Sequence, residues 1–175
     1  MKKSHAAGLC ITLAIIVLIA LDQWLKYYIR TEFRVGETRD ILPFFQLVFV
    51  ENYGMAFGIS WLPQWVLVAF RIIMVALLLY YLTMLVRRQD TSVRPTYIAM
   101  IVLITAGAIG NIIDFFTYGP VIDMFYFPLI RNAAGEVIFF RPVFNLADSY
   151  ITVAVFAIIL FFTKDLNKSL EKSEK

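Results

Sequence analysis

The sequence predicts an all-α membrane protein with four transmembrane helices and a small extracytoplasmic β-like loop region. Its 175 residues are 61% hydrophobic and only 17% charged, whereas a soluble domain has roughly 45–50% apolar and about 25% charged residues. The apolar residues gather into blocks long enough to cross a bilayer, which takes roughly 20 residues. The two longer segments between blocks contain glycines and short apolar runs, a pattern typical of strands.

Four apolar blocks are predicted to be membrane-spanning helices, at about residues 8–29, 65–86, 97–116 and 143–162. Helices of this length satisfy their own backbone groups in lipid. We expect one integral membrane domain over residues 1–175, ending in a charged cytoplasmic tail over residues 163–175. The first block is too long for the apolar core of a cleavable signal peptide, so we expect it to remain as a helix.

The distribution of positive residues predicts the orientation of the chain in the membrane. Lys2 and Lys3 precede the first block, Arg87, Arg88 and Arg94 lie between the second and third, and four lysines follow the fourth. Because positive residues remain on the cytoplasmic side, we expect both termini inside and the two longer loops outside. Orientation explains the net charge of +3, so we expect no nucleic-acid partner.

The two outer loops are predicted to hold short strands at the membrane surface. In residues 36–60 the apolar stretches Ile41–Phe45 and Leu47–Val50 precede a glycine-containing segment, which indicates strands. In residues 124–142 two aromatic-rich arms flank a polar centre at Arg131–Gly135. Aromatic side chains favour headgroup depth, so this loop is predicted to form a hairpin or a flap on the membrane.

Ionisable and amide side chains inside the predicted spans are candidate functional residues, because each costs roughly 2.5–3.5 kcal/mol to insert. The predicted helix directions place this group near the outer ends of the spans. Its members are Asp22, Lys26, Arg71, Asn111, Asp114, Asn145 and Asp148, with Asp123 just past the third span.

Three interpretations of this outer group remain open. Polar side chains can simply join helices, and Asp22 and Lys26 have the i,i+4 spacing of a favourable pair. Carboxylates can also line an ion or proton pathway, although the inner halves of the spans carry none. The corresponding alternatives to an enzyme are a small coupled transporter and a non-catalytic assembly subunit. The third interpretation is hydrolysis at the membrane surface.

The hydrolytic interpretation depends on carboxylates alone. The single histidine, His5, and the single cysteine, Cys10, both lie toward the inner side, so neither a nucleophilic triad nor a zinc site is available at the outer end, and we expect no metal and no cofactor. Two close carboxylates cannot both ionise, so one keeps a proton. The ionised carboxylate then activates water while the protonated one polarises a carbonyl group.

Position along the chain separates Asp114 from Asp123. Asp114 shares a helix face with Gly107, Gly110 and Asn111, so it is predicted to pack against other helices. Asp123 follows Gly119-Pro120, and proline ends a helix. Asp123 is therefore predicted to lie free of helix packing, where it can meet Asp148 at the start of the fourth helix.

Five blocks of sequence, in order along the chain, resemble the signature blocks of lipoprotein signal peptidase (signal peptidase II), an aspartyl peptidase family. The blocks are Asp22-Gln23-Trp24-Leu25-Lys26, Asn52-Tyr53-Gly54-Met55-Ala56-Phe57-Gly58, Gly110-Asn111-Ile112-Ile113-Asp114, Gly119-Pro120-Val121-Ile122-Asp123-Met124-Phe125 and Phe144-Asn145-Leu146-Ala147-Asp148-Ser149.

The resemblance implies a membrane aspartyl endopeptidase that cleaves signal peptides from diacylglyceryl-modified prolipoproteins just before the lipidated cysteine. It implies the outer face of the bacterial inner membrane, prolipoprotein and lipid as partners, and inhibition by globomycin; we expect a monomer. The matching positions are Asp123 and Asp148 as catalytic residues, Asn52, Gly54, Asn111 and Asn145 as substrate-binding residues, and Asp22, Lys26 and Asp114 as residues that organise the site.

Phe115 departs from the family pattern, which usually has arginine directly after the aspartate that matches Asp114. A positive group near the substrate backbone is therefore absent from that position, and Arg71 is a candidate to replace it. Met55 stands where alanine is common, and the 124–142 loop is longer than usual.

Overall fold

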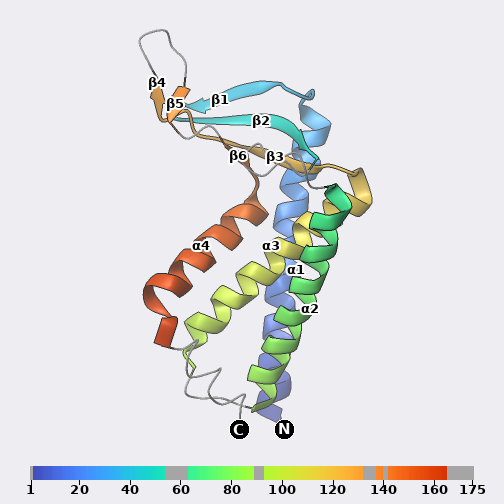
Figure 1. Cartoon of the computed structure of the whole chain (residues 1–175), viewed down its shortest axis with the longest axis vertical. Helices are drawn as coiled ribbons and strands as arrows, with labels where there is room; N and C mark the ends of the chain where they lie inside the picture. Colours follow the sequence, from blue (N-terminus) through green and yellow to red (C-terminus); the bar gives the residue numbers. More distant parts are fainter. Residues whose placement is uncertain (1, 54–62, 89–92, 132–136, 140–141, 165–175) are drawn as a thin grey trace.

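The structure, a computed structural model, describes residues 2–53, 63–88, 93–131, 137–139 and 142–164. Four helices run between one end of the molecule and the other (Figure 1). Their bounds are Lys2–Glu32 for α1, Gln64–Arg88 for α2, Pro95–Tyr118 for α3 and Leu146–Phe161 for α4. α1 begins and α4 ends at the end opposite the sheet (Figure 1).

Three of the described helices, α1, α2 and α3, are long and apolar enough to cross a membrane. The fourth, α4, is apolar but has 16 residues, which is about 24 Å at 1.5 Å per residue and less than the ~30 Å hydrocarbon core. The membrane fold class is therefore confirmed, with three full-length helices and one shorter apolar helix.

The central helix is α3, which packs against each of the other three helices. At the end away from the sheet, α1, α2 and α3 meet in an apolar core. The members of this inner core include Ile15, Leu82, Leu85, Tyr97, Ile101 and Val102, all buried. Tyr81 and Tyr97 join their hydroxyl groups there at 2.9 Å.

A four-stranded antiparallel sheet lies across the other end of the bundle (Figure 1). The strand order is β1 (Thr38–Leu42), β2 (Phe45–Asn52), β3 (Val121–Tyr126) and β6 (Val143–Phe144). One face packs on the end of α1 through the buried residues Ile29, Phe33, Phe49, Ile122 and Met124. The predicted β-like region is thus confirmed.

The predicted hairpin in the second outer loop is also present, because β4 (Ile130–Arg131) pairs with β5 (Val137–Phe139). Arg131–Gly135, the polar centre of that loop, lies outside the described residues except for Arg131. Gly54, predicted to bind substrate, is outside them too, as is most of the predicted tail over residues 163–175.

The fourth helix begins at Leu146, three residues later than predicted. Val143 and Phe144 are apolar, so in the sequence they extend the helical block without a break. In the structure they pair with Tyr126 and Phe125 as strand β6, and Asn145 caps the helix. Hydrogen bonds to a strand distant in sequence therefore override the local apolar pattern.

Candidate active site

The end of α3 directs the chain into the strand that carries Asp123. Gly119 caps the helix at φ +90°, a conformation that glycine adopts at little cost. Its N–H donates to the carbonyls of Asp114 at 3.2 Å and Phe115 at 3.1 Å. The predicted break at Gly119-Pro120 is thus present, and Asp123 follows on β3, where it is buried.

Asp148 lies in the first turn of α4 and forms a capping box with Asn145. The Asp148 N–H donates to the Asn145 side-chain oxygen at 2.8 Å, and the Asn145 N–H donates to the Asp148 carboxylate at 3.4 Å. A cap of this kind satisfies backbone donors that a helix start leaves without partners. It also fixes the direction in which the Asp148 carboxylate points.

Amide side chains join the two carboxylates. Asn145 Nδ2 donates to Asp123 Oδ1 at 2.8 Å, and Asn52 Nδ2 donates to Asp123 Oδ2 at 2.9 Å. Asn111 Nδ2 donates to Asp148 Oδ1 at 2.8 Å. Asn145 therefore contacts both aspartates, and the structure brings together residues from β2, α3, β3 and α4.

The environment of Asp123 favours its protonated form. Burial raises the pKa of Asp123, and the nearby negative charge of Asp148 raises it further, to about 7. The amide donors of Asn52 and Asn145 act in the opposite direction because they stabilise the carboxylate. A carboxyl group that keeps a proton near neutral pH can act as a general acid.

Beneath the two aspartates, Lys26 is the centre of a buried ion cluster. Its ammonium group lies 2.8 Å from Asp22 Oδ2, 2.8 Å from Asp114 Oδ2 and 3.0 Å from Asn111 Oδ1. A lysine has three N–H donors, so these contacts use all of them. All four side chains are buried, and a buried charge persists only when it is paired.

The carboxylates of this cluster also hold the backbone beside each candidate catalytic residue. Asp114 Oδ2 accepts the N–H of Ile122 at 3.1 Å, and Asp22 Oδ1 accepts the N–H of Ala147 at 2.9 Å. Ile122 and Ala147 immediately precede Asp123 and Asp148 in the chain. One lysine therefore connects, through two carboxylates, to the backbone positions of both aspartates.

Two glycines allow the helices to approach closely at this level. A Cβ atom at Gly107 would lie 2.5 Å from the Ala147 carbonyl oxygen, and one at Gly110 would lie 2.6 Å from Asp22 Oδ2. Neither contact is tolerated without displacement. The start of α4 and the ion cluster therefore depend on the absence of side chains at these positions.

Comparison with known proteins shows which family has this arrangement. The family model described as "Signal peptidase (SPase) II" matches residues 14–164. The chain belongs to the signal peptidase II family. This assignment confirms the resemblance identified from the five sequence blocks, and it makes the chain an aspartic-type signal peptidase of a bacterial membrane.

Individual members of the family are similar over most of their length. Lipoprotein signal peptidase of Porphyromonas gingivalis is 32% identical over 94% of this chain and 87% of that protein. The Chlorobium phaeovibrioides protein of the same name is 38% identical over 83% of this chain and 85% of that protein. A solved structure described as "Bacterial membrane enzyme structure by the in meso method at 2.3 A resolution" has a TM-score of 0.68 at 29% identity, covering 91% of this chain and 90% of that one.

Gln23 contributes to the site of this signal peptidase II, although sequence reasoning assigned it no role. Its side-chain amide donates to Asp114 Oδ1 at 2.9 Å, to the Gly110 carbonyl at 3.1 Å and to Asp22 Oδ2 at 3.3 Å. The sequence carried a signal, because Gln23 is an amide inside a predicted span, directly beside Asp22. It joins α1 to α3 next to the ion cluster.

Two arginines lie toward the sheet end of the helices, and the predicted role of Arg71 near the substrate backbone stays a prediction. Arg71 lies on α2 and, within the described part of the chain, does not join the network around the aspartates. Arg30, at the end of α1, places its guanidinium 4.2 Å from the centre of the Tyr118 ring and 3.6 Å from Glu51. Phe115 packs edge-on against Phe116 at 5.2 Å between ring centres.

Proposed function

We propose that this chain removes signal peptides from diacylglyceryl-modified prolipoproteins and cuts just before the lipidated cysteine, with Asp123 and Asp148 as the catalytic pair. The observation that carries the proposal is the bridge formed by Asn145, whose side chain contacts both aspartates. The buried cluster around Lys26 supports it, because fixed backbone on both sides gives the pair a constant geometry.

The reaction follows from the protonation of the pair. Asp123, with its pKa raised to about 7, holds the shared proton, and we assign the role of general base to Asp148. Asp148 removes a proton from a water molecule, whose oxygen attacks the scissile carbonyl carbon, while Asp123 donates its proton to the carbonyl oxygen. As the C–N bond breaks, the amine takes the proton held by Asp148, and Asp123 recovers its proton from the collapsing hydroxyl group.

Two of the four predicted substrate-binding residues are committed to other contacts. The Asn145 side chain is fully buried and bonds to Asp123, Asn111 and the Asp148 backbone. Asn111 is also buried, and its side chain joins Lys26 to Asp148. We therefore assign both amides to holding the catalytic pair. We keep substrate binding for Asn52, which is half-buried and also donates to Asp123, and for Gly54.

We place the enzyme in the bacterial inner membrane, with its active site at the outer face and both termini in the cytoplasm. The positive residues at the chain ends and near Arg87 support this orientation. The sheet lies at the opposite end of the bundle from the start of α1 (Figure 1), and the two aspartates lie on β3 of that sheet and in the first turn of α4. We expect the chain to act as a monomer that contacts membrane lipid.

Cysteine labelling tests the orientation. In a chain whose own Cys10 has been replaced by alanine, Leu129→Cys is expected to react with an impermeant reagent added from outside, since Leu129 is exposed on the sheet side. Arg87→Cys, at the end of α2, is expected to react only after the membrane is opened. The reverse pattern would contradict the placement of the active site.

The cleavage reaction is tested with the purified enzyme in detergent and a lipidated prolipoprotein. The expected result is a mass loss equal to the signal peptide, blocked by globomycin. An unmodified prolipoprotein is the control, and it should remain intact. An intact lipidated substrate would refute the proposal and leave the transporter or assembly-subunit interpretation.

A further inference from the structure

Four phenylalanine rings form a closed cluster on the sheet beside the aspartate pair. This phenylalanine cluster consists of Phe45, Phe125, Phe127 and Phe144, all half-buried. Phe127 stacks on Phe45 at 4.9 Å between ring centres and on Phe144 at 5.8 Å. Phe125 lies 5.9 Å from both Phe45 and Phe144.

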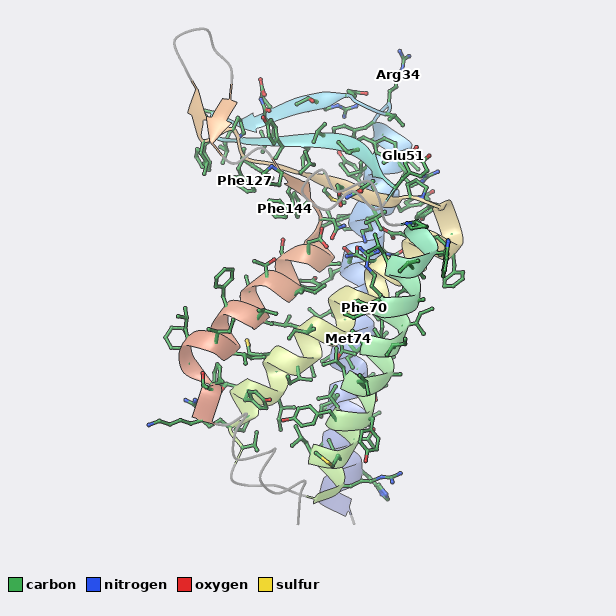
Figure 2. All side chains as sticks on the ribbon, in the orientation of Figure 1. Arg34, Glu51, Phe70, Met74, Phe127 and Phe144 are labelled. Atoms are coloured by element: carbon green, nitrogen blue, oxygen red, sulfur yellow. The ribbon has the colours of Figure 1, made fainter. Side chains whose placement is uncertain are left out.

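The phenylalanine cluster begins next to the catalytic residues. Phe125 follows Asp123 by two positions on β3, and side chains two apart on a strand share a face. Phe144 is opposite Phe125 in the sheet and directly precedes Asn145. Figure 2 shows Phe127 and Phe144 between the sheet and the first turns of α4. The rings therefore continue away from the aspartates toward Phe127.

The surroundings of the aspartate pair are otherwise polar on the side of the bundle. Lys26, Asp114 and Asn111 close that side, and all three are buried and bonded to each other or to Asp148. An apolar group attached to the reacting residue cannot enter such a cluster without displacing buried ion pairs. The phenylalanine cluster is the adjoining surface with the opposite character, so an apolar group can lie on its half-buried rings without displacing an ion pair.

This inference rests on the proposed function, which places the carbonyl before a lipidated cysteine between Asp123 and Asp148. The cysteine sulfur carries the diacylglyceryl group a few bonds from that carbonyl, so the acyl chains must start beside the aspartates. We propose that the phenylalanine cluster is the subsite for the diacylglyceryl group, with the first segments of the acyl chains lying on the rings of Phe125, Phe127 and Phe144. Contact between alkyl chains and aromatic rings buries a large apolar area.

Phe127 is the residue to change, because it follows β3 and takes no part in holding the aspartates. The substrates are two peptides of the same sequence around one cysteine, one S-dipalmitoylglyceryl and the other S-diacetylglyceryl. With Phe127→Ala we expect the KM of the dipalmitoyl peptide to rise about tenfold, as loss of one buried aromatic contact allows. The KM of the diacetyl peptide and both kcat values should stay within about twofold.

Two further variants control this experiment. Phe127→Leu retains apolar area and should restore most of the affinity for the dipalmitoyl peptide. Phe116→Ala removes a ring of the same size that is 69% exposed near the end of α3, outside the phenylalanine cluster, and should leave both substrates unaffected. Melting temperatures of all variants should match that of the unaltered enzyme.

Several results would overturn the inference. An equal rise in KM for both peptides would show that Phe127 supports the fold of the site and does not bind acyl chains. A rise that disappears when an apolar signal-peptide residue is replaced by alanine would assign the phenylalanine cluster to the signal peptide. Cleavage of neither peptide by the unaltered enzyme would instead refute the proposed function itself.

Discussion

At the end of the bundle away from the sheet, α1, α2 and α3 meet through apolar side chains such as Ile15, Leu82 and Ile101. At the sheet end, by contrast, α1, α3 and α4 meet around the charge of Lys26. In lipid, apolar side chains gain little from contacting each other over contacting acyl chains. The inner core therefore fills space, and the polar cluster determines where α1, α3 and α4 stand relative to one another.

This difference explains why the two aspartates that we propose as the catalytic pair lie where they do. A hydrogen bond has a direction and a length, so Asp22 and Asp114 fix the backbone beside Asp148 and Asp123 to within a narrow range. An apolar contact between helices permits sliding and rotation at small cost. Changes at the sheet end should accordingly affect turnover and stability far more than changes in the inner core.

The largest effect is expected from the two aspartates themselves. Asp123→Asn and Asp148→Asn keep the side-chain shape but cannot hold or transfer the proton, so each should lower kcat by at least about 100-fold. Both variants should retain their yield and melting temperature. The measurement is single-turnover cleavage of a lipidated prolipoprotein beside a thermal melt in detergent.

Asp114→Asn is the matched control for these two variants. It removes the charge that faces Lys26 at 2.8 Å, so it should lower the melting temperature while the surviving folded protein remains active. A well-folded but inactive Asp114→Asn together with an active Asp123→Asn would make Asp114 the partner of Asp148.

Lys26→Met is expected to have the next largest effect, on stability. It leaves the buried carboxylates of Asp22 and Asp114 without a counter-charge, and breaking a buried pair in this way costs about 3–5 kcal/mol. Thr105→Val is the control, at a buried polar residue of α3 outside the ion cluster. The Thr105 hydroxyl is buried and donates only within its own helix, to the Ile101 carbonyl, so its loss should cost less than about 1 kcal/mol.

Chemical denaturation in mixed micelles measures both free energies of unfolding. Similar losses for Lys26→Met and Thr105→Val would remove the distinction between the two ends of the bundle.

Gly107→Ala should have a moderate effect on activity. Its Cβ would lie 2.5 Å from the Ala147 carbonyl oxygen, so the start of α4 must shift and carry Asp148 with it. Small displacements of catalytic groups are costly, and we expect kcat to fall about tenfold, as a barrier increase of about 1.4 kcal/mol produces.

Gly8→Ala is the control for the Gly107 variant, because the nearest atom to its Cβ, on Val86, is 3.9 Å away. The same cleavage assay should find it fully active. An active Gly107→Ala would show that the α3–α4 contact near Ala147 is not required to hold the site.

The last prediction concerns pH. If Asp123 and Asp148 are the catalytic pair, turnover needs one proton on the pair. Because the pKa of Asp123 is raised to about 7, kcat/KM should then fall as pH rises above about 7, by about tenfold per pH unit. The free energy of unfolding should also fall as pH rises. An acid with a raised pKa in the folded state stabilises the fold at low pH, and this contribution is lost as pH rises from its usual value of 3.8 toward about 7. Asp123→Asn should abolish that part of the pH dependence of unfolding, and an unchanged dependence would assign it to another group.

The sequence was sufficient to predict the membrane class, the gathering of polar residues toward one end of the helices and the break after α3. These features depend on apolar block length, on charges inside spans and on Gly119-Pro120, all of which are local. The pairing of β2 with β3 joins Val50 to Asp123, and a contact between residues so distant in the chain leaves no local pattern. The hydrogen bonds that the backbone N–H groups of Ile122 and Ala147 donate to Asp114 and Asp22 depend on geometry that side-chain identity does not encode.

Residue type alone also does not determine exposure here. Cysteine is among the residues most often buried in soluble proteins, but Cys10 is exposed on α1, since lipid accepts an apolar side chain as readily as a protein core does. Arg71 was grouped with the outer residues by depth alone. Depth follows from position along a helix, whereas the direction of a side chain depends on how the helices pack.

The hydrogen bond between Asp22 on α1 and the Ala147 N–H on α4 also constrains when the site can form during synthesis. Asp22 and Lys26 leave the ribosome early and neutralise each other within one helix turn, which lowers the cost of inserting α1 into lipid. Asp22 finds the Ala147 N–H, its partner on α4, only when the last helix has been synthesised. A newly made chain that stops before α4 therefore lacks Asp148 and has no complete aspartate pair. We expect peptidase activity only after all four helices have been synthesised and inserted.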